Sequence, residues 1–311
     1  MSGRMRVGVI GVGHLGQHHA RLLAAMPEVE LIGVVDADAD RAALIASRCG
    51  TQAFVRAEDL LGRVDAVTVA TPTVAHLEAA APFLSRGVGV LVEKPIAATL
   101  DEADTLLRLA AEGGAVLAAG HTERFNPAVT AAWPLIREPR FVEVHRLGVF
   151  PDRSLDIDVI FDLMIHDFDL LLATVGSEVV SIEAVGVAVL TSRVDIANVR
   201  LRFASGCIAN LTASRISRDR TRKIRFFQQD AYVSIDCASR ETEVYRLQST
   251  EGRPVIMGGA IDVQDAEPLR VELEDFVTAV RTRRAPRVTG EDGRRALALA
   301  ERVRAEMQQG R

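Results

Sequence analysis

The chain has 311 residues, which is long enough for two domains, because a single hydrophobic core stops growing efficiently at about 250 to 300 residues. Apolar residues make up 48% and charged residues 25%, which excludes a disordered chain, a collagen and a coiled-coil rod. The net charge is −5, so the sequence offers no basic face for a nucleic-acid partner.

Cysteine usage and hydropathy narrow the setting of the protein. The three cysteines, Cys49, Cys207 and Cys237, lie far apart, so neither a disulfide framework nor a thiolate zinc site is predicted. Glycines interrupt the apolar residues near the N-terminus, which favours a strand entering a turn over a signal peptide. No uncharged apolar stretch approaches the roughly 18 residues that span a bilayer. We therefore expect a cytoplasmic protein with no membrane partner.

The first 120 residues alternate short apolar runs with helical segments, a pattern typical of βαβ units and a parallel sheet. The expected strands are 6–10, 30–35, 52–55, 66–70, 89–92 and 115–119. Between the last two, Thr99 and Glu102 have the spacing of a capping box and predict a helix start. Six such strands form a complete doubly wound Rossmann domain, which we place at residues 1–121.

A glycine-rich motif, GVGHLG at positions 11–16, follows the first strand directly and opens a helix. In this context the motif predicts dinucleotide binding, although an ordinary glycine turn is the alternative. The first glycine allows a tight turn, the second lets backbone amides approach a pyrophosphate, and the third permits close helix packing. The predicted cofactor contacts in the motif are Gly11, Gly13, His14, Leu15 and Gly16.

Asp36 ends the second expected strand, twenty residues after Gly16. This is the spacing of a carboxylate that accepts hydrogen bonds from the adenosine ribose hydroxyls, and it favours NAD over NADP. Nearby Arg41 softens that preference, because a guanidinium attracts the additional phosphate of NADP. A strand-end turn or a helix cap is the alternative role for Asp36.

Thr71 and Pro72 follow the fourth expected strand, and His76 comes one helical step later. The carboxyl ends of parallel strands form the edge at which open α/β sheets bind ligands, so these three residues are predicted to line the cofactor. The alternative is a proline turn that caps a helix.

Glu93-Lys94-Pro95 ends the fifth expected strand on the same edge of the sheet, and Glu93 and Lys94 are further predicted cofactor contacts. Lys94 and Lys223 are the only lysines among 37 basic residues. Because arginine cannot be deprotonated and presents a fork rather than a point charge, a retained lysine suggests chemistry that arginine cannot perform. Lys94 is therefore a candidate catalytic residue.

After about residue 121 the pattern changes to one helical region near 158–174 and long alternating strands, which predicts an α+β domain over residues 122–311. One face of 198–203 is apolar and the other is polar and partly cationic. The segment 249–268 is typical of a long hairpin or loop, and helices are expected at 269–282 and from Thr289, with Asp292 as its capping partner. An open sheet face of this kind predicts a homodimer or homotetramer.

Within the helical stretch 156–167, Asp162 and His166 lie four residues apart, on one helix face. An imidazole has an ordinary pKa of about 6.5 and can accept a hydroxyl proton near neutral pH. A surface ion pair is the alternative. No third ligand stands at metal spacing from the histidines, so no metal is predicted.

These three motifs in this order, the glycine-rich turn, Glu-Lys-Pro and Asp-x-x-x-His, resemble the glucose-fructose oxidoreductase, inositol dehydrogenase and rhizopine catabolism (Gfo/Idh/MocA) family over the whole chain. The resemblance implies that Lys94 contacts substrate and nicotinamide ribose, and that Asp162 and His166 face the reactive carbon. It leaves open whether Lys94 or His166 accepts the proton. One departure is that residues 159–161 are apolar where many members carry glycines.

The resemblance also implies that the crossing segment 120–127 contributes to the active site, with Arg124 and Asn126 as candidate substrate contacts. A plain hinge, in which Pro127 opens a helix, is the alternative. This segment and the run 158–167 look most like the subgroup that acts on nucleotide-activated aminosugars. Four later arginines then serve a diphosphate, or belong to a solvated face or an oligomer contact: Arg215, Arg218, Arg220 and Arg222.

The activity that the resemblance implies is NAD-dependent oxidation of a ring hydroxyl, at carbon 3 of a UDP-N-acetylaminosugar. One alternative is a dehydrogenase of a free sugar or inositol, or a reductase of another carbonyl or conjugated double bond. The other is a non-catalytic, dinucleotide-sensing regulatory protein of the same fold, although such a sensor needs neither Lys94 nor His166.

Overall fold

The structure is a computed structural model, and it describes residues 3–150, 157–250 and 253–309. The chain divides into two compact units. Unit 1 comprises Met1–Thr122 and Leu269–Leu297, and unit 2 comprises Glu123–Pro268 and Ala298–Arg311. Among the described residues, no helix is both long and apolar enough to cross a membrane.

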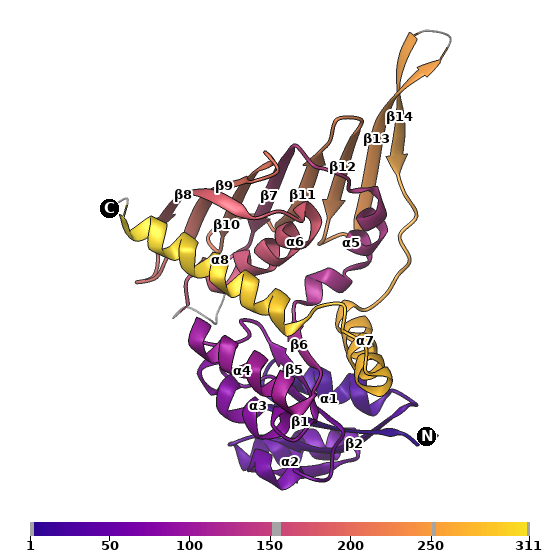
Figure 1. Cartoon of the computed structure of the whole chain (residues 1–311), viewed down its shortest axis with the longest axis vertical. Helices are drawn as coiled ribbons and strands as arrows, with labels where there is room; N and C mark the ends of the chain where they lie inside the picture. Colours follow the sequence, from indigo (N-terminus) through magenta and orange to yellow (C-terminus); the bar gives the residue numbers. More distant parts are fainter. Residues whose placement is uncertain (1–2, 151–156, 251–252, 310–311) are drawn as a thin grey trace. The chain divides into compact units, whose positions relative to one another are not determined.

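Unit 1 is built on a six-stranded parallel sheet in the order β3-β2-β1-β4-β5-β6 (Figure 1). Its strands are β1 (Met5–Ile10), β2 (Val29–Val35), β3 (Gln52–Phe54), β4 (Ala66–Val69), β5 (Gly89–Glu93) and β6 (Leu117–Gly120). This order confirms the predicted doubly wound sheet. The direction in which the strand order runs changes between β1 and β4. Open sheets of this kind bind ligands at that point, beyond the carboxyl ends of the strands.

Helices cover the strands of unit 1, which explains why β4 and β5 are buried along their whole length. The helices are α1 (Gly16–Ala24), α2 (Ala39–Cys49), α3 (His76–Leu84), α4 (Leu100–Gly113) and α7 (Pro268–Thr282), with the first part of α8 (Gly290–Gln309). The predicted capping box at the start of α4 is confirmed, because the Thr99 hydroxyl accepts the Glu102 N–H at 3.2 Å. The predicted cap of α8 is confirmed in the same way, with the Thr289 hydroxyl accepting the Asp292 N–H at 3.1 Å.

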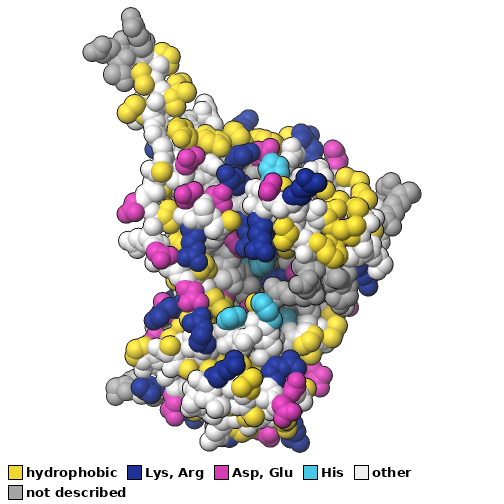
Figure 2. All heavy atoms as spheres, turned by 180° about the vertical axis from the view of Figure 1, so that it is seen from behind, with side chains coloured by type: hydrophobic (Ala, Val, Ile, Leu, Met, Phe, Trp, Pro, Cys, Tyr) yellow, Lys and Arg dark blue, Asp and Glu magenta, His cyan; other side chains and the backbone are white. Residues whose placement is uncertain are grey.

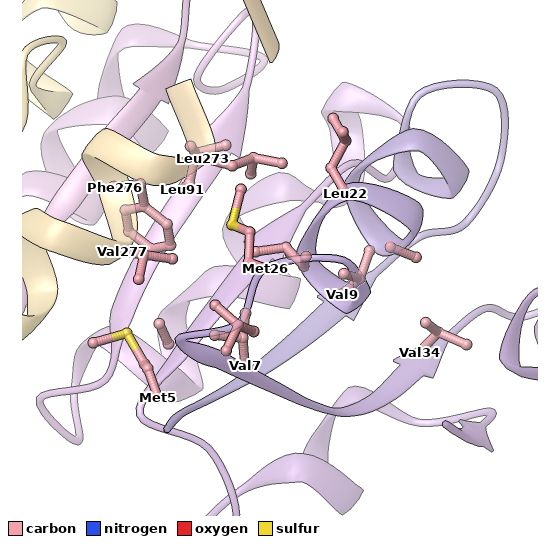
Figure 3. Close-up of a cluster of buried hydrophobic side chains, with 14 of the residues drawn as sticks. Met5, Val7, Val9, Leu22, Met26, Val34, Leu91, Leu273, Phe276 and Val277 are labelled. Carbon is pink, nitrogen blue, oxygen red and sulfur yellow. The ribbon is translucent and has the colours of Figure 1, made fainter. Parts of the chain in front are cut away.

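Helix α7 returns the chain to unit 1 after the whole of the second sheet. Its apolar side chains Leu273, Phe276 and Val277 are almost fully buried in a core cluster that includes Met5 and Leu91 (Figure 3). The expected boundary at residue 121 placed α7 with the second domain. The structure divides the chain differently, because the buried face of α7 is complementary to the core of unit 1.

Unit 2 is built on an eight-stranded sheet in the order β14-β13-β12-β11-β7-β10-β9-β8. Its strands are β7 (Phe141–Leu147), β8 (Val179–Val187), β9 (Ile196–Phe203), β10 (Ile208–Ser214), β11 (Thr221–Phe227), β12 (Ala231–Asp236), β13 (Glu241–Thr250) and β14 (Arg253–Ala260). Among the described residues of this unit, only β7 and β10 pair in parallel, which confirms the predicted mostly antiparallel sheet. The segment 249–268, expected as a long hairpin or loop, contains the end of β13 and all of β14, which pair as a hairpin, and residues 261–267 follow without helix or strand.

One face of this sheet carries the helices α5 (Pro127–Ala132) and α6 (Ile165–Val175) (Figure 1). Side chains that face these helices are buried and the alternate ones are partly exposed, as in β7 and β12. The predicted apolar face of residues 198–203 is confirmed, since Val199, Leu201 and Phe203 are at most 1% exposed. Unit 2 therefore has a covered face and a face with charged and aromatic side chains within reach of solvent.

Candidate active site

The glycine-rich turn of unit 1 lies between the ends of β1 and β4. Gly11 has a φ of +81°, and a Cβ there would lie 2.7 Å from the backbone nitrogen of Thr71. A Cβ on Gly16 would lie 1.8 Å from the carbonyl oxygen of Gly11, so only glycine lets α1 start this close to the turn. At Gly13 the space is open, with only the Arg41 guanidinium within 4 Å. The turn thus has the close-approach geometry that a pyrophosphate at a helix N-terminus requires.

The Asp36 carboxylate connects the end of β2 to this turn. Its Oδ2 accepts the N–H of Val12 at 2.9 Å, and its Oδ1 accepts the N–H of Asp38 at 3.0 Å. The helix-cap role belongs instead to Asp38, whose carboxylate accepts the Arg41 N–H at 3.1 Å at the start of α2. Each Asp36 oxygen retains capacity for a further hydrogen bond, as a ribose contact requires.

His76 lies at the start of α3 and is only 1% exposed. Its Nδ1 lies 3.0 Å from the Pro95 carbonyl oxygen, and its Nε2 lies 3.0 Å from that of Thr71. Burial lowers the pKa of this imidazole in spite of the two carbonyls. His76 therefore joins the segment after β4 to the segment after β5, while the buried Thr71 hydroxyl has no hydrogen-bond partner within the described ranges.

The Glu93-Lys94-Pro95 turn follows β5 and contains a cis peptide bond before Pro95. The Glu93 carboxylate is buried, with one oxygen 3.0 Å from Nε2 of His19 and the other accepting the Lys94 N–H at 3.2 Å. Lys94 is partly exposed at the same sheet edge as Gly11 and Thr71. Unit 1 thus gathers the predicted cofactor contacts and Lys94 at one edge.

In unit 2 the predicted helix carrying Asp162 and His166 begins as a π-helix, Ile160–Met164, and continues as α6. Asp162 lies on the π-helical segment and His166 is the second residue of α6; both are partly exposed. Asp156, the first residue of the predicted stretch, lies outside the described residues. π-Helical segments occur frequently at functional sites, because they change which side chains share a face.

A buried ion-pair network adjoins His166 in unit 2. Asp167 accepts three hydrogen bonds from the Arg146 guanidinium, at 2.7, 2.8 and 3.1 Å, and Arg146 also lies 3.3 Å from Glu123. Burial lowers the pKa of Arg146, but the carboxylates of Asp167 and Glu123 outweigh it and raise that pKa. Burial raises the pKa of Asp167 against the influence of Arg146. The bidentate geometry is that of an ion pair, so the carboxylate is the form that Arg146 holds.

The crossing segment between β6 and α5 is also buried. Arg124 forms a bidentate pair with Asp169 of α6, at 2.7 and 2.9 Å. Asn126 caps α5 through the Ala128 N–H and donates to the Cys237 carbonyl, at 3.1 and 3.0 Å. Pro127 opens α5, as the hinge alternative expected. The substrate contacts predicted for Arg124 and Asn126 stay predictions.

The structure corrects the grouping of the four later arginines. Arg215 is 2% exposed and pairs with the buried Asp195 at 2.8 Å, so it presents no charge for a diphosphate. Arg222 has a half-exposed side chain 3.6 Å from Glu123, beside the network of Arg146. Arg218 and Arg220 are exposed. Within residues 3–150, 157–250 and 253–309, no cluster of His, Cys, Asp and Glu could hold a metal ion.

Sequence reasoning missed His19, Arg146, Asp167 and Asp169 as parts of these sites. Each had a detectable signal in the sequence, because a titratable residue occupies a position on an otherwise apolar face of its helix or strand. His19 precedes Ala20, Leu22 and Leu23 on the buried face of α1. Arg146 follows Val142 and Val144 on the buried face of β7. A charged residue on such a buried face requires a buried partner.

Comparison with known families gives two matches along the chain. Residues 5–121 match the oxidoreductase family with an NAD-binding Rossmann fold, GFO_IDH_MocA. Residues 138–234 match the GFO/IDH/MocA C-terminal domain.

Similar individual proteins include the UDP-N-acetylglucosamine 3-dehydrogenase of Acidithiobacillus ferrooxidans, 42% identical over 96% of each chain. The solved structure of that enzyme, GnnA, superimposes with a TM-score of 0.92 over 98% of each chain. The inositol 2-dehydrogenase of Rhizobium meliloti is 27% identical over 96% of this chain and 95% of the relative.

Proposed function

Since the chain belongs to the Gfo/Idh/MocA family of NAD-binding oxidoreductases, we propose that it oxidises the hydroxyl at carbon 3 of UDP-N-acetylglucosamine, with NAD as hydride acceptor. The family and the oxidoreductase class confirm the sequence prediction. The substrate rests on one observation, the 42% identity to a UDP-N-acetylglucosamine 3-dehydrogenase over 96% of each chain.

The residues of unit 1 fit a bound dinucleotide. Three features lie at the end of the parallel sheet: the open space at Gly13, the free capacity of the Asp36 oxygens, and the Thr71 hydroxyl, which has no partner among the described residues. A bound nicotinamide supplies the hydride acceptor for the reaction. We assign NAD rather than NADP, because the Asp36 carboxylate repels the extra phosphate of NADP.

The chemistry that we assign to the chain is proton removal and charge stabilisation. His166 accepts the proton of the reacting hydroxyl while the Lys94 ammonium stabilises the developing alkoxide, and Asp162 hydrogen-bonds to the sugar beside it. The support for this division is the position of Lys94, whose backbone N–H donates to the buried Glu93 carboxylate at the ligand-binding edge of the sheet.

A second candidate substrate is a free polyol, which the similarity to inositol 2-dehydrogenase favours. Incubation of the protein with NAD and a panel of UDP-sugars, free sugars and inositols, followed by NADH absorbance and product analysis, separates the candidates. We expect turnover with UDP-N-acetylglucosamine and a 3-keto product. Turnover with free polyols alone would replace the substrate, and dinucleotide binding without turnover would support a sensor.

For the assembly, we propose a homodimer or homotetramer formed through unit 2. In Figure 2 hydrophobic side chains lie along the β13–β14 hairpin, where Leu247, Ile256 and Met257 are 66%, 73% and 50% exposed. Exposed apolar clusters of this kind mark protein interaction surfaces. Light scattering at micromolar concentration is expected to give a multiple of 33.7 kDa, and the monomer mass would contradict the proposal.

A further inference from the structure

His19 is a buried imidazole on the helix that follows the glycine-rich turn. It lies three residues after Gly16 on α1, and its side chain is 0% exposed. Its neighbours on the buried face of the helix, Leu22 and Leu23, are apolar. A polar ring in such a position is costly unless it is hydrogen-bonded, so its partner identifies its role.

The partner of His19 is the glutamate that precedes Lys94. Nε2 of His19 lies 3.0 Å from one oxygen of Glu93, and the other oxygen accepts the Lys94 N–H at 3.2 Å. The carboxylate therefore connects α1 on one side to the backbone of Lys94 on the other. All three residues belong to unit 1.

The proton of this hydrogen bond can be placed. Nδ1 of His19 is buried, and no acceptor for it occurs in the part of the chain that the structure describes. A single proton on Nε2 satisfies the contact with Glu93 and leaves nothing unsatisfied as a donor. Burial raises the pKa of Glu93, but the hydrogen bond from His19 and the neighbouring Lys94 lower it below its ordinary value. The glutamate is thus held as a carboxylate.

The Glu93 side chain has little freedom to move. A Cβ on Gly120 of β6 would lie 3.0 Å from both Cα and the carboxyl carbon of Glu93, so the neighbouring strand packs directly against it. Beyond Lys94, the Pro95 carbonyl is held by His76 at 3.0 Å. The turn is therefore fixed on both sides of Lys94, by a histidine from α1 and a histidine from α3.

We propose that His19 is a positioning residue for the reaction. It holds the Glu93 carboxylate against the Lys94 backbone, so that α1, the helix after the glycine-rich turn, determines the position of Lys94. This inference rests on the role of Lys94 in the proposed function. In the proposed function His19 contacts neither substrate nor cofactor. Loss of the Nε2–H donor leaves the carboxylate without its partner and allows the turn to shift, and small displacements of a reacting group are costly in rate.

The test compares His19→Met, which removes the donor at similar size, with His19→Gln, whose amide retains a donor. The matched control is His18→Met, since His18 is the exposed neighbour on the same helix. With UDP-N-acetylglucosamine and NAD, His19→Met is expected to lower kcat by about ten- to a hundredfold. His19→Gln and His18→Met should stay within about threefold of wild type, as should KM for the sugar and Kd for NAD in all three.

A double-mutant cycle with Lys94→Met separates positioning from general damage. If His19 acts through Lys94, adding His19→Met to Lys94→Met should lower kcat no further. Additive losses, a loss confined to NAD affinity, or wild-type turnover in His19→Met would each overturn the proposal. Full turnover of Lys94→Met alone would instead overturn the role that the proposed function gives to Lys94, and absence of turnover in the wild-type protein would overturn the proposed function itself.

One measurement needs no variant and covers a His19→Met protein that fails to fold. The ¹⁵N shifts of the imidazoles in the wild-type protein report which ring nitrogen carries the proton. The proposal requires a protonated Nε2 in His19. A bare Nε2 there would overturn it.

Discussion

The two units hold their candidate site residues in different ways. In unit 1 the glycine-rich turn is held by close backbone contacts, such as that between Gly16 and Gly11. In unit 2 the helix that carries His166 is anchored by side chains, through the buried pairs of Arg146 with Asp167 and Arg124 with Asp169. Side-chain changes beside the glycine-rich turn should therefore alter mainly the affinity for the dinucleotide, whereas breaking a buried pair of unit 2 should lower the stability of the fold.

The largest effect should come from the two residues that we assign to the reacting hydroxyl, one in each unit. Lys94→Met and His166→Ala should each lower kcat by about a hundredfold to ten-thousandfold, because each removes a positioned charge or base. Kd for NAD, measured by titration calorimetry, should change much less.

The matched control for Lys94 is Lys223→Met, which removes the only other lysine, a residue paired with Asp236 at 3.4 Å. It should retain wild-type kcat. Near-normal turnover in both active-site variants would show that neither unit contributes the groups that we assign.

The difference between the two units predicts a large loss of stability when one of the buried ion pairs that anchor α6 in unit 2 is broken. Asp167→Asn removes the bidentate carboxylate of the buried Arg146 and leaves it, among the described residues, only Glu123 at 3.3 Å, which should cost about 3–5 kcal/mol in the free energy of unfolding. The measurement is urea unfolding, with kcat determined on the folded protein.

The control is Asp265→Asn, because Asp265 pairs with Arg240 at 2.9 Å while its side chain is 92% exposed. An exposed pair of this kind should contribute at most about 1 kcal/mol. Equal losses of stability in the two variants would show that the buried network does not anchor the helix.

The same difference explains how far the sequence could be interpreted. The sheet order of unit 1, its glycine-rich turn and its caps follow from patterns within about thirty residues, since βαβ units are local. In unit 2 the partners of Arg146 and Arg124 lie 21 and 45 residues away, and no local pattern specifies which carboxylate each one meets. The return of α7 to unit 1 and the π-helical start before α6 were unpredictable for the same reason, since tertiary packing decides both.

Cofactor choice tests the prediction that side-chain changes beside the glycine-rich turn of unit 1 alter the affinity for the dinucleotide. Asp36→Ala removes the carboxylate that faces the glycine-rich turn, so Kd for NAD should rise by about tenfold, as expected for the loss of hydrogen bonds to a charged group. Discrimination against NADP should fall, with Arg41 available to the extra phosphate. Asp40→Ala, an exposed carboxylate on α2, is the control and should change neither. A wild-type protein that binds NADP more tightly than NAD would contradict the assignment.

The smallest expected effect concerns His76, whose side chain joins two backbone segments of unit 1. Burial lowers its pKa in the folded protein relative to the unfolded chain, where the value is about 6.5. The unfolded state then binds more protons than the folded state as the pH falls below that value. The stabilisation that the buried, uncharged His76 provides is therefore complete above about pH 6.5 and is lost as the pH falls. His76→Gln keeps donors for the carbonyls but cannot ionise, so its free energy of unfolding should fall less than that of wild type between pH 7.5 and pH 5. Urea unfolding at the two pH values measures this difference, with His145→Gln, a partly exposed histidine in unit 2, as the control. An unchanged pH dependence in His76→Gln would show that the pKa of His76 does not differ between the folded and unfolded states.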